Sequence, residues 1–231
     1  MAHIAGHAVG QGLGKLMTMT IGTEILYSFI IIACSLMIYF GTKELYILTS
    51  HKGIKYFRKA FLFFALAYFF GSFIKIILLY FQRSEIRTFL PIFGSITLFI
   101  FMYFSSMAIF YLLYSVTWKK WKSKSAIYVF HVIALIIATT ISLFRNHEVY
   151  LLINVILFAF IAFTVYSSYI QSKKKKPHNL YAIYLLLFIF WIFNILDILI
   201  PNFFQSFQLL IYLASSGIFL IIFYKVIKKT G

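Results

Sequence analysis

Apolar residues are grouped along this chain in long runs that are separated by short polar breaks. A helix needs about 20 apolar residues to cross a hydrocarbon core about 30 Å thick. Seven runs have about this length, at residues 22–41, 60–81, 89–117, 126–144, 148–170, 180–200 and 203–227. The pattern predicts an all-α integral membrane protein whose single domain, residues 22–231, is a seven-transmembrane-helix bundle. Residues 1–21 form a Gly-rich lead outside the membrane.

Two of the breaks between runs are short, and the number of spans depends on them. Pro201 and Asn202 alone separate the last two runs, and a proline there favours a tight turn over a continuous helix. Residues 145–147, Arg-Asn-His, separate the fourth run from the fifth. If either break failed to turn the chain, the count would fall to six or five.

The distribution of basic residues decides between these counts. With seven spans, four basic residues lie on one side (Lys15, Arg83, Arg87 and Arg145), and Lys75 lies inside the second span. The other side holds sixteen of the 21 Lys and Arg residues. Cytoplasmic loops of membrane proteins are enriched in Lys and Arg, so we expect the N-terminus outside and the C-terminus in the cytoplasm. The sixteen residues are Lys43, Lys52, Lys55, Arg58, Lys59, Lys119, Lys120, Lys122, Lys124, Lys173, Lys174, Lys175, Lys176, Lys225, Lys228 and Lys229.

Composition agrees with a lipid environment. The chain is 63% hydrophobic and only 11% charged, with a mean hydropathy of +0.95, whereas globular domains are about 45–50% apolar and about 25% charged. A net charge of +16 would suggest nucleic acid as the partner of a soluble protein. On the cytoplasmic side of a membrane the same lysines meet anionic lipid headgroups. We therefore expect a multi-pass protein of the cell membrane whose partners are the lipid bilayer, its anionic headgroups and an acidic cytoplasmic protein, with no nucleic acid.

Lys75 and Asp197 are charged residues that lie inside predicted spans. Lys75 is about six residues from the outer end of the second span, or ~9 Å deep at 1.5 Å per residue. Asp197 lies about one turn from the outer end of the sixth span. Because charges inside a membrane usually have partners, we predict that Lys75 and Asp197 approach each other. In the alternative, the Lys75 ammonium extends to the outer headgroups.

Other polar residues fall at the same depth and predict a candidate ligand site. The interpretation is a polar, outward-facing cavity among the second, third, fifth, sixth and seventh spans. Interhelical hydrogen bonds alone are the alternative. The candidate binding residues are Lys75, Asp197, Asn194, Ser72, Asn154, Gln205, Gln208 and Tyr212, and Glu24, Ser95 and Thr97 lie at a similar level.

The sequence predicts no metal site and no cofactor. Cys34 is the only cysteine, so there is no intrachain disulfide or cysteine cluster. His3 and His7 are spaced as two ligands on one helical face, but the surrounding glycines favour a flexible tail. His131, in the inner half of the fourth span, is interpreted as a packing or hydrogen-bonding residue. Retinal is disfavoured because the middle of the last span, residues 213–217, contains no lysine.

The predicted architecture is that of receptor-like proteins, by analogy and not by a motif. No paired carboxylates, HExxH, Gly-x-Ser-x-Gly or Cys/His dyad is present, so we expect no enzyme. A receptor or sensor with a separate cytoplasmic partner is the preferred hypothesis. A transporter or channel is the first alternative, although internal repeats and inner-half charges are lacking. A structural or assembly subunit is the second.

Overall fold

The computed structural model describes residues 2–81, 90–119, 125–144, 147–174, 180–199 and 205–230. Within them it describes the side chains of residues 22–73, 76, 92–119, 125–144, 148–170, 181–197 and 207–228. These residues are almost entirely α-helical, and no strand occurs among them. The helices are α1 (Ala2–Gly41), α2 (Lys43–Thr49), α3 (Lys52–Phe81), α4 (Leu90–Thr117), α5 (Ser125–Phe144), α6 (His147–Lys174), α7 (Leu180–Leu199) and α8 (Gln205–Thr230).

Five segments among the described residues are long and apolar enough to cross a membrane. They are Gly22–Thr49, Ile92–Thr117, Ser125–Phe144, Glu148–Ile170 and Phe207–Lys228. In α7 a shorter apolar segment covers Tyr181–Asp197. Together they identify an all-α, multi-pass membrane protein.

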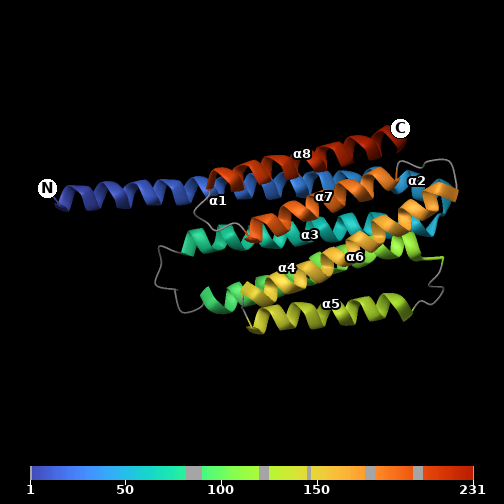
Figure 1. Ribbon diagram of the computed structural model, residues 1–231, viewed down its shortest axis with the longest axis horizontal. Coiled ribbons are helices and arrows are strands. Elements are labelled where there is room, and N and C mark those ends of the chain that lie inside the picture. The colour runs from blue at the N-terminus through green and yellow to red at the C-terminus, as the bar shows by residue number, and fades with distance from the viewer. Residues whose placement is uncertain are drawn as a thin grey trace.

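The seven long helices lie side by side, and successive ones run in opposite directions (Figure 1). The chain ends therefore lie at opposite ends of the bundle. One end, near the C-terminus, carries the exposed residues Lys43, Lys52, Lys55, Lys119 and Lys228, and is called the basic end. The other is called the cavity end for the site described below.

Packing between the helices forms a closed ring of six. Around the ring α1 contacts α3, α3 contacts α4, α4 contacts α6, α6 contacts α7, α7 contacts α8, and α8 returns to α1. The fifth helix lies outside this ring, packed mainly on α4 and only lightly on α6 (Figure 1). The ring leaves space in its interior, and α5 does not border that space.

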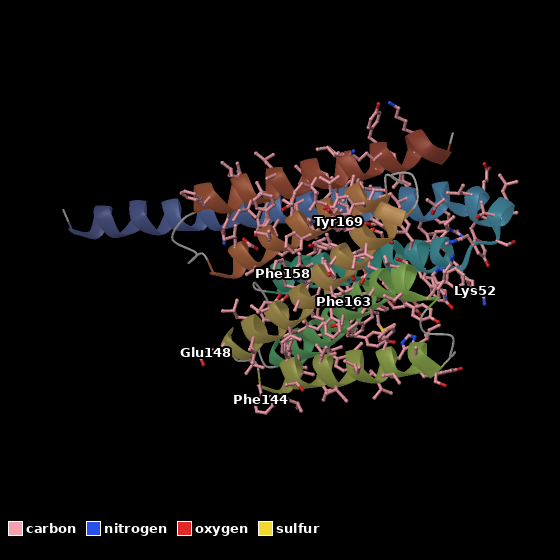
Figure 2. All side chains as sticks on the ribbon, turned by 45° about the vertical axis from the view of Figure 1, so that its right-hand side comes forward. Lys52, Phe144, Glu148, Phe158, Phe163 and Tyr169 are labelled. Carbon is pink, nitrogen blue, oxygen red and sulfur yellow. The ribbon has the colours of Figure 1, made fainter. Side chains whose placement is uncertain are left out.

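Burial follows this arrangement. In its most apolar window α4 is 61% buried, whereas α5 is only 22% buried. The buried face of α5 includes Ala134 and Ala138, both fully buried, and small residues one turn apart allow a neighbouring helix to approach closely. Its other faces expose large apolar side chains such as Ile136 and Leu143, suited to lipid tails. Large apolar side chains are also exposed along the other long helices (Figure 2).

One expectation about the N-terminal lead was wrong. The glycines there predict a flexible tail, but α1 is helical from Ala2, and its first turns project beyond the bundle (Figure 1). Extending an existing helix adds a hydrogen bond for each residue fixed and avoids the cost of nucleation, which compensates for glycine. The side chains of His3 and His7 lie outside the described residues.

The connection between α1 and α3 is ordered at the basic end. The short helix α2 has no buried residue and exposes Ile47 and Leu48. The Arg58 side chain donates from Nε to the carbonyl oxygen of Tyr39 at 3.0 Å and lies over the rings of Tyr39 and Tyr46. These contacts connect α1, α2 and α3 at this end of the bundle.

Candidate functional site

A cavity of about 420 Å³ lies inside the six-helix ring, at the cavity end. This volume is within the usual range of small-molecule sites. All six helices of the ring border it, and α5 does not. The lining residues are Glu24, Tyr27, Ser28, Tyr68, Gly71, Ser72, Gly94, Thr97, Leu98, Phe101, Ser105, Tyr150, Asn154, Trp191, Asn194, Asp197 and Tyr212.

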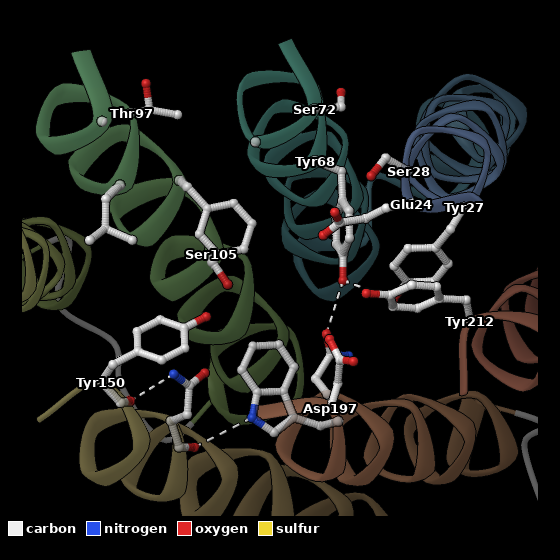
Figure 3. A pocket seen from close by; sticks show the side chains of 17 residues that line it. Glu24, Tyr27, Ser28, Tyr68, Ser72, Thr97, Ser105, Tyr150, Asp197 and Tyr212 are labelled. Atoms are coloured by element: carbon white, nitrogen blue, oxygen red, sulfur yellow. Dashed lines mark hydrogen bonds between the residues drawn. The ribbon is translucent and has the colours of Figure 1, made fainter. Parts of the chain in front are cut away.

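A cluster of three tyrosines and Asn194 joins four helices on one side of the cavity. The hydroxyls of Tyr27 and Tyr68 lie 3.3 Å apart, and Tyr68 donates to Oδ1 of Asn194 at 3.2 Å. Tyr27 is stacked on Tyr212, with ring centroids 4.9 Å apart and 19° between the planes (Figure 3). This cluster connects α1, α3, α7 and α8, so a ligand that displaces one ring changes the packing of all four helices.

The opposite wall is formed by α6 and α7. The side chain of Asn154 donates from Nδ2 to the carbonyl oxygen of Tyr150 at 2.8 Å. The indole of Trp191 donates to the carbonyl oxygen of Asn154 at 3.4 Å (Figure 3). The Trp191 indole therefore links α7 to the backbone of α6, whereas the bond of the Asn154 side chain stays within α6. Both side chains border the cavity.

Two carboxylates line the cavity, Glu24 from α1 and Asp197 from α7. Both side chains are directed into the space beside Tyr68 (Figure 3). The Oδ1 atom of Asp197 is shielded from solvent. Among the described lining residues there is no Lys, Arg or His, so the described wall of the cavity is acidic.

The structure brings most of the predicted site residues together. Ser72, Asn154, Asn194, Asp197 and Tyr212 all line this cavity. Their ligand-binding role stays a prediction.

Among the predicted residues whose side chains the structure describes, Gln208 alone is not part of the lining. Gln208 is half-buried and lies one turn closer to the start of α8 than Tyr212, outside the cavity wall. The side chains of Lys75 and Gln205 lie outside the described residues, and with them the predicted approach of Lys75 to Asp197.

Sequence reasoning missed the contribution of the first span beyond Glu24, and most of the aromatic wall. Tyr27, Ser28, Phe101, Ser105 and Tyr150 all border the cavity. Tyrosines are common at membrane interfaces, so those in this chain carried little information singly. The available signal was position: Tyr27 and Tyr68 lie several residues inside their runs, where a hydroxyl needs a partner.

Four phenylalanines close the cavity toward the basic end. Phe61 and Phe64 of α3, Phe190 of α7 and Phe219 of α8 are each at most 1% exposed. Phe219 contacts the other three, with ring centroids 6.4, 6.2 and 4.6 Å away, respectively. We call these four residues the phenylalanine floor.

A smaller cavity of about 90 Å³ lies on the other side of the floor. On α3 one helical face carries Phe57 in the smaller cavity, then Phe61 and Phe64 in the floor, then Tyr68 in the larger cavity. The same order along the helix, from smaller cavity through floor to larger cavity, occurs on α7 and, in the reverse direction of the chain, on α8. The smaller cavity is lined by Thr42, Leu45, His51, Gly53, Ile54, Phe57, Ser115, Ile183, Tyr184 and Val226.

His131 lies in a separate polar cluster between α4 and α5. Its Nδ1 is 2.8 Å from the Tyr103 hydroxyl and its Nε2 is 3.4 Å from the Tyr111 hydroxyl. Lys59 lies 5.5 Å from the centre of the Tyr111 ring, and burial together with neighbouring Lys55 lowers the pKa of Lys59. Both imidazole nitrogens thus have hydroxyl neighbours, as a hydrogen-bonding role requires. No group of three metal-ligating side chains occurs in the described part of the chain.

No protein-family model, curated protein or solved structure matches this chain.

Proposed function

We propose that this chain is a seven-pass receptor or sensor of the cell membrane. Its N-terminus lies outside and its C-terminus in the cytoplasm, and the larger cavity binds a small molecule from outside. The observation that carries the proposal is a cavity of about 420 Å³ at the end of the bundle opposite the lysines, closed below by the phenylalanine floor. Such a site admits a ligand without offering it a path through.

The count of seven rests on α3 and α7 in addition to the five apolar segments. At 1.5 Å per residue, the 20 residues of α7 extend ~30 Å and the 30 residues of α3 ~45 Å, enough for a hydrocarbon core. The alternation of helix directions in Figure 1 supports counting both as spans. The exposed lysines of the basic end then give the orientation through the positive-inside rule.

The same helices that form the site extend to the basic end, which supports signal transfer. A ligand beside Tyr68 alters the contacts of α1, α3, α7 and α8, and each of these helices runs to the end that carries the lysines. A small shift of packed helices is an established way to pass a signal through a bundle. At the basic end, anionic headgroups or an acidic partner protein would respond to the shift.

Thiol labelling in intact cells tests the orientation and the outward access of the cavity. In a Cys34→Ala background, Ser72→Cys places one thiol in the cavity, and Thr49→Cys places one at the exposed end of α2. We expect a membrane-impermeant maleimide to label the cysteine at position 72 in intact cells and the one at 49 only after permeabilisation. The reverse pattern, or no labelling at position 72, would overturn the proposal.

A transporter is the second candidate, favoured by the smaller cavity on the far side of the floor. A carrier must part the floor during its cycle, so Phe219→Cys in the Cys34→Ala background would react with small impermeant thiol reagents from either side. In a sensor this buried position stays unreactive from both. Reaction from both sides in a folded protein would favour transport over sensing.

A further inference from the structure

The polar cluster around His131 joins three helices and is separate from both cavities. It consists of Lys59 from α3, Tyr103 and Tyr111 from α4, and His131 from α5. None of these four residues borders the larger or the smaller cavity. Lys59, Tyr103 and His131 are half-buried, so part of each side chain is open to the surroundings of the bundle. We call the four residues the Lys59 cluster.

The Lys59 cluster lies at the depth where phospholipid headgroups meet acyl chains. At 1.5 Å per residue, Lys59 is ~10 Å from the start of α3 and His131 is ~9 Å from the start of α5, both counted from the basic end. Lys59 also directly precedes the apolar run that begins at residue 60. Next to His131, Val132 is 55% exposed, as suits a side chain in contact with lipid. The phosphates of the surrounding leaflet are therefore within reach of the cluster.

The ammonium of Lys59 has no carboxylate partner in the part of the chain that the structure describes. Its contacts are with the ring of Tyr111, whose centre is 5.5 Å from Nζ, and with the charge of Lys55. Burial and this second cation lower the pKa of Lys59, and an anion beside it would stabilise its charged form. Residues 120–124, which connect α4 to α5, contain three more lysines and no acidic residue.

Hydrogen-bond counting at His131 leaves at least one tyrosine hydrogen over. The hydroxyls of Tyr103 and Tyr111 lie 2.8 and 3.4 Å from its two ring nitrogens, and neither has another hydrogen-bond partner among the described residues. A neutral imidazole accepts at one nitrogen and donates at the other. It can therefore accept from only one tyrosine, and the other keeps its hydrogen for a third group. A protonated imidazole would leave both hydrogens over.

We propose that the Lys59 cluster binds the phosphate of one anionic phospholipid from the leaflet around the basic end. The Lys59 ammonium and a tyrosine hydroxyl donate to the phosphate oxygens, and the acyl chains lie against the exposed apolar face of α5. Lysine binds phosphate as a point charge, and basic sites between membrane helices hold anionic headgroups. A zwitterionic lipid is disfavoured, because the cations of the cluster repel the ammonium group that it carries beside its phosphate. The exposed lysines of the basic end, in contrast, attract any negative surface.

Native mass spectrometry of the full chain released from detergent micelles would measure this binding. The probes are phosphatidylglycerol, which is anionic, and phosphatidylcholine, which is zwitterionic, with the same acyl chains. We expect one bound phosphatidylglycerol with an affinity at least tenfold higher than that of phosphatidylcholine. Lys59→Met should lower the affinity for phosphatidylglycerol at least tenfold. Lys228→Met is the matched control and should change it less than twofold, because Lys228 also lies over a tyrosine ring, 5.8 Å from the centre of Tyr224, but is exposed.

A photoactivatable phosphatidylglycerol would locate the lipid in the wild-type chain, with no variant that has to fold. With a diazirine near the headgroup, we expect crosslinks on α3 and α5 close to Lys59 and His131. Crosslinks confined to other helices would overturn the site. The double variant Tyr103→Phe, Tyr111→Phe should weaken binding at least threefold. An unchanged affinity in this variant would contradict the hydrogen-bond count on which the site rests.

Two further outcomes would overturn the proposal. Equal affinities for the two lipids, or equal losses in Lys59→Met and Lys228→Met, would mean that the basic end attracts lipid only diffusely. Inorganic phosphate in large excess over the lipid should not displace phosphatidylglycerol, since it lacks acyl chains to lie against α5. Displacement by inorganic phosphate would mean that the cluster binds a soluble anion and not a lipid.

Discussion

Replacing Phe219 with alanine should remove the central member of the phenylalanine floor. Phe219 is fully buried and contacts Phe61, Phe64 and Phe190. In a soluble protein Phe→Ala in a core costs about 3–5 kcal/mol. In a bilayer the side chain stays in lipid even when the helices separate, so the part of this cost that comes from transfer to water largely disappears. The part that comes from lost packing remains.

The packing loss can be estimated from the three ring pairs. Each aromatic pair contributes about 0.5–1.5 kcal/mol beyond burial, so Phe219→Ala should lower the free energy of unfolding by about 2–4 kcal/mol. Reversible unfolding in mixed micelles of increasing SDS content would measure it. Leu220→Ala is the matched control, because Leu220 is the next residue and is 50% exposed toward lipid. We expect the control to change stability by less than about 0.5 kcal/mol.

The same variant tests whether the floor separates the two cavities. With Phe219 shortened, the larger and smaller cavities would become continuous, and a cysteine at Ser115 in the smaller cavity should become reactive from the outer side. Equal stability losses in Phe219→Ala and Leu220→Ala would refute the packing argument. An unreactive Ser115→Cys in a folded Phe219→Ala protein would refute the role of the floor as the barrier.

Three further predictions follow from local geometry. Tyr68→Phe removes the hydroxyl that contacts Tyr27 and Asn194, and should lower the free energy of unfolding in SDS by about 1 kcal/mol. No change would mean that these contacts do not stabilise the six-helix ring. Gly53→Ala places a Cβ 2.8 Å from the Ser115 carbonyl oxygen, whereas Gly22→Ala meets nothing within 4 Å. We expect the Gly53 variant to lose about 1–3 kcal/mol of unfolding free energy and the Gly22 variant to lose none. Similar values in both variants would argue against close packing of Gly53 on Ser115. The folded-state pKa of Lys59 is lowered from 10.5, so the unfolded state binds more protons and the free energy of unfolding should rise as pH increases toward 10.5. Lys59→Met should flatten that rise in unfolding curves measured across this pH range. An unchanged slope would mean that Lys59 is not its source.

The length of each apolar run predicted the long helices to within a few residues over most of the chain. Membrane thickness and backbone hydrogen bonding leave few other solutions for such runs. The structure differs mainly at the ends: α3 begins at Lys52 and not near residue 60, because the basic residues before the apolar run still have good helix propensity. The order of helices around the ring was not predictable, since it depends on contacts between different helices, such as that of Phe190 in α7 with Phe219 in α8.

Polar residues at matching depth were enough to locate the cavity but not to complete its wall. Asn154, Asn194 and Asp197 lie on two different helices and still meet, because residues at one level of a bundle face a common interior. Tyr27 could not be selected in this way. Its role depends on stacking against Tyr212, a contact between the first and last helices that no local pattern records.

The position of α5 has a consequence for how the chain can be built. In Figure 1, α4 and α6 are neighbours in the ring and point the same way, so the chain must travel back along the bundle before it can add α6. The helix α5 runs in this opposite direction and places the start of α6 at the same end of the bundle as the start of α4. Its outward face can vary widely in sequence without touching the cavity. Its removal, however, would reverse the direction of α6, α7 and α8, which are three of the six helices that border the cavity.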